Sequence, residues 1–262
     1  MKRRMAAGLA LALMMQAFQA EAILTRADRD DEEYVELATR YPAAVSLGPG
    51  GGVGVLVGPR WILTAAHRAN ALRAGAKLAL AGASVEIQEV FVHPDWKGGA
   101  GPDIALVFLR TAVLGVDAVP PYRLQDEVGQ TARVVGTGGA GRIGAPAGKA
   151  DGRARAAINT VDRATEATLG MRLKGPEDAS DLQGALAPGD TGAPAFFEVG
   201  GRFFVAGIAS RTEDTNRDGI AGSVGDWEIY TRVSACAAWI DAVAGDAMAA
   251  EAAAIVGDPE RR

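Results

Sequence analysis

The most informative segment of the sequence reads Trp61-Ile62-Leu63-Thr64-Ala65-Ala66-His67. Its first half is a run of aromatic, leucine and β-branched residues, which is typical of a buried β-strand. The run ends on two alanines, and such small residues would let the imidazole that follows reach a cleft without crowding a substrate. Because the chain has only two histidines, any histidine-dependent mechanism must use His67 or His93. His93 stands beside Pro94 at the end of another apolar run, where a structural role is more common, so His67 is the candidate general base.

Two further segments offer partners for this histidine. Asp103 precedes the apolar run Ile104-Ala105-Leu106-Val107, and a carboxylate at the mouth of such a strand is costly to bury alone. An imidazole N–H would satisfy it and fix the tautomer, although the same aspartate also fits an ordinary turn before a strand. The segment Pro188-Gly189-Asp190-Thr191-Gly192-Ala193-Pro194 places a hydroxyl between glycines. Such a turn can aim successive backbone N–H groups at one point, as an oxyanion hole requires, but loops of this composition are also common elsewhere.

The rest of the chain is rich in expected β-strands. Short apolar runs alternate with Gly, Pro and Asp, and this close spacing favours barrels or sandwiches over βαβ units. A segment at 111–127 contains a Pro-Pro pair and fits an interdomain connection, and 138–152 is rich in Gly and Ala and fits a surface loop. After Tyr230 the apolar spacing becomes helical. The expected strands lie at residues 52–58, 61–66, 77–81, 85–92, 104–110, 132–136, 202–209 and 227–233.

Taken together, the histidine, aspartate and Gly-Asp-Thr-Gly motifs resemble those of the chymotrypsin/trypsin family of proteases, and they occur in the family's order. The segment Gly207-Ile208-Ala209-Ser210 resembles the strand that pairs with bound substrate, and the segment from Tyr230 to Ile240 resembles the last strand and the carboxy-terminal helix. The resemblance covers about 23–243. It implies an all-β fold of two six-stranded antiparallel β-barrels within a domain at 23–245. The first barrel would span about 23–118, the second about 119–233 and the helix about 234–245, before a tail at 246–262.

The same resemblance implies a secreted endopeptidase that acts on a protein or peptide substrate. His67, Asp103 and Thr191 would form the catalytic triad, and the N–H groups of Gly189 and Thr191 the oxyanion hole. Thr191 stands where the family normally has Ser, and its extra methyl group restricts χ1 and would lie beside the substrate carbonyl. The chain is therefore either a specialised protease with a threonine nucleophile or a pseudoprotease that keeps the fold for binding. The cysteines that bracket the family's active site are missing: Arg68 follows His67, and Cys236 is the only cysteine.

The first twenty-two residues fit a signal peptide. A charged start is followed by an apolar run and by Ala20-Glu21-Ala22, which satisfies the small-x-small cleavage rule. The run is too short to span a bilayer, and the alternative is a buried amino-terminal helix. Cleavage would release Ile23, whose α-amino group the resemblance would pair with Asp190; Ile23 is otherwise simply the first apolar residue after the cut. We therefore expect a secreted or periplasmic protein, and the absence of disulfides favours a bacterial one.

The resemblance also places a substrate pocket, and a separate loop suggests a metal. Ala185 would form the pocket floor, and Ser210 and Thr212 a wall. With no acidic residue at the floor, small or apolar substrate side chains are expected.

The loop Asp214-Thr215-Asn216-Arg217-Asp218-Gly219 has oxygen ligands at alternate positions, namely Asp214, Asn216 and Asp218, with glycine sixth. Calcium loops share this spacing. Gly225 stands where the full pattern needs Glu, so a structural calcium ion and a solvated acidic turn are both open. No other cofactor is expected.

Composition excludes several other functions. The chain is 48% hydrophobic and 23% charged, as in ordinary globular proteins, with a net charge of −5. Removal of residues 1–22 would leave 24 basic against 31 acidic residues. No basic stripe is present, which argues against a nucleic-acid partner. There is no Gly-rich nucleotide loop after a strand and no cluster of His and Cys. A monomer without a membrane span is expected.

Overall fold

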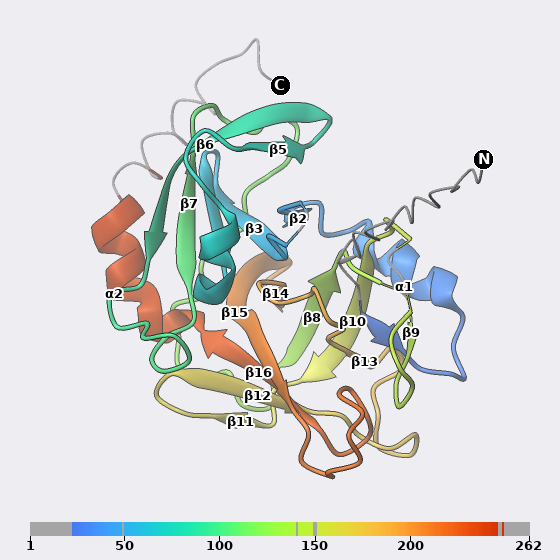
Figure 1. The fold of residues 1–262 in the computed structure, drawn as a ribbon. Coiled ribbons are helices and arrows are strands. Elements are labelled where there is room, and N and C mark those ends of the chain that lie inside the picture. Colours follow the sequence, from blue (N-terminus) through green and yellow to red (C-terminus); the bar gives the residue numbers. More distant parts are fainter. Residues whose placement is uncertain (1–22, 49, 140, 149–150, 246–247, 249–262) are drawn as a thin grey trace, which may run out of the picture.

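The computed structural model describes residues 23–48, 50–139, 141–148, 151–245 and 248. Within these residues the chain forms two large antiparallel sheets, one from each half of the sequence, packed side by side (Figure 1). The expected signal segment lies outside the described residues, as does nearly all of the expected tail.

The first sheet comes from the amino-terminal half and has the strand order β2-β3-β4-β7-β6-β5. Strand β4 is buried along its whole length because it lies between β3 and β7, which explains its uninterrupted apolar sequence. Thr64, at the end of β4, pairs with Ala105, at the start of β7. The residues just after β4 and just before β7 therefore lie at the same edge of the sheet. Its strands are β2 (Ala44–Ser46), β3 (Val53–Gly58), β4 (Trp61–Thr64), β5 (Lys77–Leu80), β6 (Ala83–Val92) and β7 (Ala105–Leu109).

The second sheet has seven strands in the order β10-β8-β14-β15-β16-β12-β11. A separate three-stranded sheet, β13-β1-β9, includes one parallel pair. The predicted all-β fold is confirmed, but the expectation of six strands in each barrel holds only for the first. The strands are β1 (Leu24–Thr25), β8 (Thr131–Gly136), β9 (Gly141–Arg142), β10 (Arg155–Thr160), β11 (Arg163–Ala164), β12 (Thr168–Arg172), β13 (Gly184–Ala185), β14 (Pro194–Val199), β15 (Arg202–Glu213) and β16 (Trp227–Arg232).

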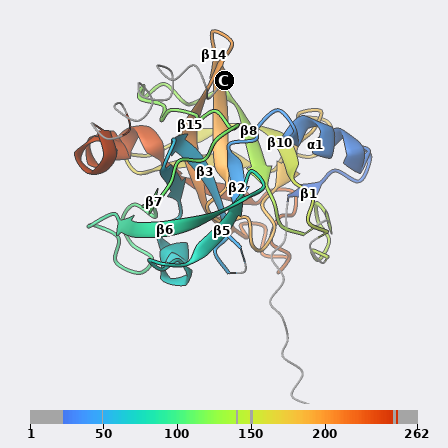
Figure 2. The ribbon, with the colours of Figure 1, turned by 90° about the horizontal axis from the view of Figure 1, so that it is seen from above.

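Helical segments are few and short. Helix α1 (Asp31–Ala38) begins at a capping box, in which Asp30 and Glu33 satisfy each other's backbone N–H groups, and it packs on β10. A 3₁₀ segment, η1 (Ala66–Ala71), follows β4. The chain ends in the segments η2 (Val233–Cys236), α2 (Ala237–Ile240) and η3 (Asp241–Gly245), which form the expected carboxy-terminal helix. Figure 2 shows α1 and this terminal helix on opposite sides of the molecule.

The two halves share a continuous core. Phe196 of the second sheet belongs to the same buried cluster as Val55 and Leu63 of the first. Cys236 lies in this cluster as a free thiol, and burial raises the pKa of that thiol to about 12. Among the described helices, none is long and apolar enough to cross a membrane. Because the chain has one cysteine and cannot form an internal disulfide, apolar packing across this shared core holds the two sheets together.

Candidate active site

His67 and Asp103 meet at the edge of the first sheet, as the register of β4 and β7 dictates. His67 Nδ1 lies 2.7 Å from Asp103 Oδ2, and the His67 backbone N–H donates to Asp103 Oδ1 at 3.0 Å. The carboxylate thus holds both the ring and the main chain of the histidine. With Nδ1 facing a carboxylate, Nε2 is the ring nitrogen left to exchange a proton with a nucleophile.

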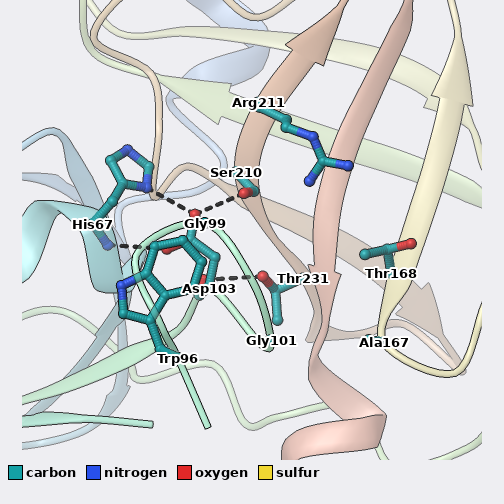
Figure 3. A pocket seen from close by; sticks show the side chains of 10 residues that line it. All are labelled: His67, Trp96, Gly99, Gly101, Asp103, Ala167, Thr168, Ser210, Arg211 and Thr231. Atoms are coloured by element: carbon teal, nitrogen blue, oxygen red, sulfur yellow. Dashed lines mark hydrogen bonds and ion pairs between the residues drawn. The ribbon is translucent and has the colours of Figure 1, made fainter.

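Asp103 is buried, at 4% exposure, and its remaining bonds come from the second sheet (Figure 3). Ser210 Oγ donates to Asp103 Oδ2 at 2.6 Å, and Thr231 Oγ1 donates to the Asp103 carbonyl oxygen at 2.9 Å. Burial alone would raise the pKa of this carboxyl, but the hydrogen bonds from His67 and Ser210 outweigh burial and hold the pKa below its usual value. Asp103 is therefore ionised at neutral pH and available to stabilise an imidazolium.

The turn that carries Thr191 is locked between the two sheets. The Thr191 carbonyl oxygen accepts from Val53 N at 3.1 Å, and Gly192 N donates to Ala209 O at 2.7 Å. Gly192 has φ of 91°, and a Cβ there would collide with the Val53 carbonyl oxygen, so only glycine fits. Gly189 has φ of 103°. In the described part of the chain, the N–H groups of Gly189 and Thr191 have no backbone partner, and they are thus available as oxyanion donors.

The Thr191 hydroxyl has an unexpected neighbour. Arg68 Nε donates a hydrogen bond to Thr191 Oγ1, and among the described residues no hydrogen bond joins Thr191 to His67. A threonine oxygen can accept two hydrogen bonds and donate one. The bond from Arg68 therefore occupies one lone pair and leaves the hydroxyl proton for another acceptor.

A cavity of about 240 Å³ opens beside the histidine. Its lining includes His67, Trp96, Asp103, Ser210 and Arg211, and Figure 3 shows these side chains around it. The cavity runs along the part of β15 that contains Ser210, the segment that the sequence analysis matched to a substrate-pairing strand.

Comparison with known proteins is consistent with this geometry. The trypsin family model matches residues 32–240. The chain belongs to the trypsin family. Among solved structures, it is similar to mouse neuropsin, a serine protease expressed in the limbic system of the brain, with a TM-score of 0.59 and 22% identity over 84% of this chain and 98% of that one. A search of curated proteins found no match.

The expected substrate pocket of this trypsin-family chain contains a residue that the sequence analysis missed. Ala185, the expected floor of the pocket, is fully buried in β13. Ser210, expected in the pocket wall, donates its hydroxyl to Asp103. Thr212 Oγ1 donates to Glu228 of β16 at 3.1 Å, and Glu228 is fully buried. Burial raises the pKa of the Glu228 carboxyl to about 8, against hydrogen bonds from Thr212 and the Leu186 backbone that lower it. The only signal in the sequence was an acidic residue within an apolar strand.

The other expected pair, Ile23 and Asp190, lies in buried surroundings. Ile23 is 1% exposed, and Leu24 beside it pairs with Ala185 and with Gly141. Asp190 has no exposed surface, accepts from Ala187 N at 3.1 Å, and lies so close to Gly136 that a Cβ there would overlap its carboxylate. The start of the described chain is thus folded into the second half of the protein.

The loop at 214–219 is closed by its own backbone. Asp214 accepts from Arg217 N at 2.7 Å and from Gly219 N at 3.0 Å, and Asp218 accepts from Ile220 N at 2.7 Å. Asn216 Oδ1 accepts from Asp218 N. No group of three or more His, Cys, Asp or Glu placed to hold a metal occurs among the described residues. Calcium at this loop stays a prediction from the sequence.

The second histidine makes no contact with the His67–Asp103 pair among the described hydrogen bonds. His93 is buried, with Nδ1 accepting from Asp95 N at 3.2 Å and its ring centre 5.0 Å from that of Trp239. Burial lowers the pKa of His93, so it is neutral at physiological pH. These contacts fit the structural role expected of it.

Proposed function

We propose that this chain is an endopeptidase that hydrolyses peptide bonds with Thr191 as nucleophile, His67 as general base and Asp103 as the group that orients His67. One observation carries the proposal: the 2.7 Å bond between His67 Nδ1 and the buried Asp103 carboxylate. Membership of the trypsin family supports the reaction class. A histidine held in this way by a buried, ionised carboxylate has little structural purpose unless it must accept a charge.

The chemistry follows from the positions of the donors and acceptors. Thr191 Oγ1 attacks the carbonyl carbon of the substrate while its proton passes to His67 Nε2. The carbonyl oxygen becomes negative and would be held by the N–H groups of Gly189 and Thr191, each such donor contributing about 3–4 kcal/mol to the transition state. His67 then gives its proton to the leaving amine, and water releases the acyl group from Thr191 by the same route.

A second candidate function is supported by the contact between Arg68 and Thr191. Because the nucleophile's hydroxyl is bonded to a guanidinium rather than to His67, and because its methyl group adds bulk, the cleft also fits a binding protein that holds peptides without cutting them. The two functions differ in one measurable respect: only an enzyme turns over substrate in a manner that depends on His67.

The test compares the mature protein with Thr191→Ser and His67→Ala on casein and on peptide esters. We expect Thr191→Ser to hydrolyse faster than the wild type, because serine lacks the methyl group, and His67→Ala to lose activity. If hydrolysis is unchanged in both variants, the proposed chemistry is wrong. If no variant hydrolyses anything while the wild type still binds peptides, the binding function replaces it.

We also propose that export and maturation occur in one cut after Ala22, so that the new α-amino group of Ile23 pairs with Asp190. The burial of Ile23 and the burial of Asp190 support this proposal, since a buried carboxylate favours a nearby cation. Amino-terminal sequencing of the secreted protein tests it. A mature chain that begins at Glu21, or well beyond Ile23, would rule the pairing out.

The proposed substrate preference is for a small or apolar side chain on the residue before the scissile bond. The burial of Ala185 and Glu228 supports it: Glu228 has no exposed surface and accepts a hydrogen bond from Thr212, so its carboxyl is not presented to a basic substrate side chain. Hydrolysis of a peptide series that varies this one residue tests the proposal. Fastest cleavage after Lys or Arg would contradict it.

A further inference from the structure

We propose that Arg68 is a recognition site for a carboxylate carried by the substrate residue directly after the scissile bond. The proposal rests on the proposed function, because it assigns a preference to the same cleft. It concerns a residue that stands where the family has a cysteine, so the family resemblance assigns it no role. Three observations carry it: where Arg68 lies, what it lacks, and which atoms it presents.

Arg68 lies between the nucleophile and the first sheet. It follows His67 in η1, and its Nε donates to Thr191 Oγ1. Gly52 borders it on the other side: a Cβ on Gly52 would lie 3.3 Å from Arg68 Cγ and would collide with the Thr191 carbonyl oxygen. The missing side chain at Gly52 thus leaves room for the guanidinium directly beside the reacting hydroxyl.

Among the described residues, Arg68 also lacks the carboxylate hydrogen bonds that the more deeply buried arginines make. Arg155 donates hydrogen bonds to both Asp31 and Asp151, and Arg232 donates to the two carboxylate oxygens of Glu127 through Nε and Nη2. Arg68 is half-buried, and burial lowers the pKa of its guanidinium, yet arginine stays charged in proteins.

In the described part of the chain, neither Nη1 nor Nη2 of Arg68 has a hydrogen-bond or ion-pair partner. The charge of Asp103 acts against the effect of burial on the guanidinium pKa, but no hydrogen bond or ion pair joins Asp103 to Arg68 among the described residues. A half-buried cation whose terminal nitrogens have no partner is costly to keep, and a carboxylate brought by a ligand would lower that cost.

The position of Arg68 in the cleft indicates which substrate residue would carry the carboxylate. The cavity along Ser210 and Arg211 does not include Arg68 in its lining. Ser210 is hydrogen-bonded to Asp103, which in turn contacts His67. Arg68 instead contacts Thr191 on the side of the nucleophile where Gly52 lies. If the acyl half of the substrate lies along β15, the leaving half must pass Gly52 and Arg68. The residue directly after the scissile bond is therefore the one next to the guanidinium.

The free atoms of Arg68 suit a carboxylate. While Nε remains on Thr191 Oγ1, the Nη1–Nη2 end of the planar guanidinium stays open, and this end matches the two oxygens of a carboxylate in a bidentate pair. A lysine would offer only a point charge. The carboxylate can come from an Asp or Glu side chain or from a free carboxy terminus, and the experiment distinguishes these two sources.

The first experiment profiles cleavage sites in a proteome-derived peptide library with the wild type, Thr191→Ser, Arg68→Ala and Arg73→Ala. Arg73→Ala is the matched control, because Arg73 is exposed and its substitution removes the same charge five residues along the chain. We expect Asp and Glu after the cleaved bond to be enriched at least tenfold over Asn and Gln, with the enrichment lost in Arg68→Ala and kept in Arg73→Ala. Cleavage with no acidic preference overturns the proposal and leaves the proposed function intact.

Matched synthetic peptides separate the two sources of the carboxylate. One pair differs by Asp or Asn after the bond, and a second ends at that residue as a free acid or an amide. Faster cleavage of the Asp peptide assigns the site to a side chain, and faster cleavage of the acid form assigns it to a terminus. Equal rates within both pairs would refute carboxylate recognition.

A binding experiment keeps the proposal testable if the protein does not cleave. An array of peptides, each in an acidic and an amide version, is probed with His67→Ala and with His67→Ala/Arg68→Ala. At least fivefold tighter binding of acidic peptides, lost without Arg68, supports the site even where the enzymatic function fails. Equal binding of both versions by both proteins overturns it.

Discussion

Replacing Glu228 with glutamine should flatten the pH dependence of this protein's stability between about pH 4.5 and pH 8. The Glu228 carboxyl has no exposed surface, and burial raises its pKa from 4.5 to about 8. The nearby buried carboxylates Asp190 and Asp226 raise it further, while the hydrogen bond from Thr212 lowers it. In the unfolded chain the same carboxyl has its ordinary pKa of 4.5.

The sign and size follow from linkage. Because the pKa of Glu228 is higher in the folded state, the folded protein binds its proton more tightly. The resulting stability is fully present below pH 4.5 and is lost as pH rises through 8. Each pKa unit corresponds to about 1.4 kcal/mol, so the free energy of unfolding should fall by about 3 kcal/mol between pH 5 and pH 8 through this one group. Glutamine has nearly the same shape and does not titrate.

Urea unfolding of the wild type, Glu228→Gln and the control Glu177→Gln at several pH values from 5 to 8 measures the effect. Glu177 is exposed, so its variant should follow the wild-type curve. Between pH 5 and pH 8 the free energy of unfolding of Glu228→Gln should fall by about 3 kcal/mol less than that of the wild type. Parallel curves for all three proteins would refute the assignment of a raised pKa to Glu228, and with it the account of Glu228 as a buried, uncharged acid at neutral pH.

Three other predictions use contacts elsewhere in the molecule. Glu127→Ala should lower the free energy of unfolding by about 3–5 kcal/mol, because it leaves the buried Arg232 guanidinium unpaired; a loss below about 1 kcal/mol in urea unfolding would contradict this. Ser210→Ala should reduce kcat/KM about tenfold or more and lower the free energy of unfolding by about 1–3 kcal/mol, because the buried Asp103 carboxylate loses a charge-assisted hydrogen bond; an unchanged kcat/KM would count against it. Calcium and chelator should leave the melting temperature unchanged, because the Asp214 oxygens accept from the loop's own N–H groups; a rise that chelator reverses would favour a calcium site.

The sequence predicted best where local pattern and burial coincide. The strands around His67 and Asp103 are continuous apolar runs. All six strands expected between residues 52 and 136 are strands in the structure. Strand β10 was missed because its alanines and polar residues carry little strand preference, and its pairing with β8 decides its conformation. Helix α1 carried a readable capping signal in Asp30 and Glu33 that the strand-based interpretation overlooked.

The site itself divides in the same way. His67 and Asp103 could each be named from a short motif beside a buried strand, and the structure brings the two side chains to 2.7 Å. The role of Thr191 as nucleophile stays a proposal. The contacts of Arg68 with Thr191 and of Thr212 with Glu228 join residues 123 and 16 positions apart, through side chains that the motifs do not mention. The first pair depends on how the two sheets pack, and the second depends on the register between β15 and β16. No local pattern in the sequence specifies either arrangement.

The central claim is that His67 and Asp103 activate the hydroxyl of Thr191. The most direct measurement is mass-spectrometric mapping of the adduct formed by a hydroxyl-directed phosphonate on the mature protein, on His67→Ala and on Thr191→Ser. We predict one adduct on residue 191 in the wild type, faster labelling in Thr191→Ser and none in His67→Ala. Labelling at another residue, or at residue 191 with equal speed in His67→Ala, would contradict the account.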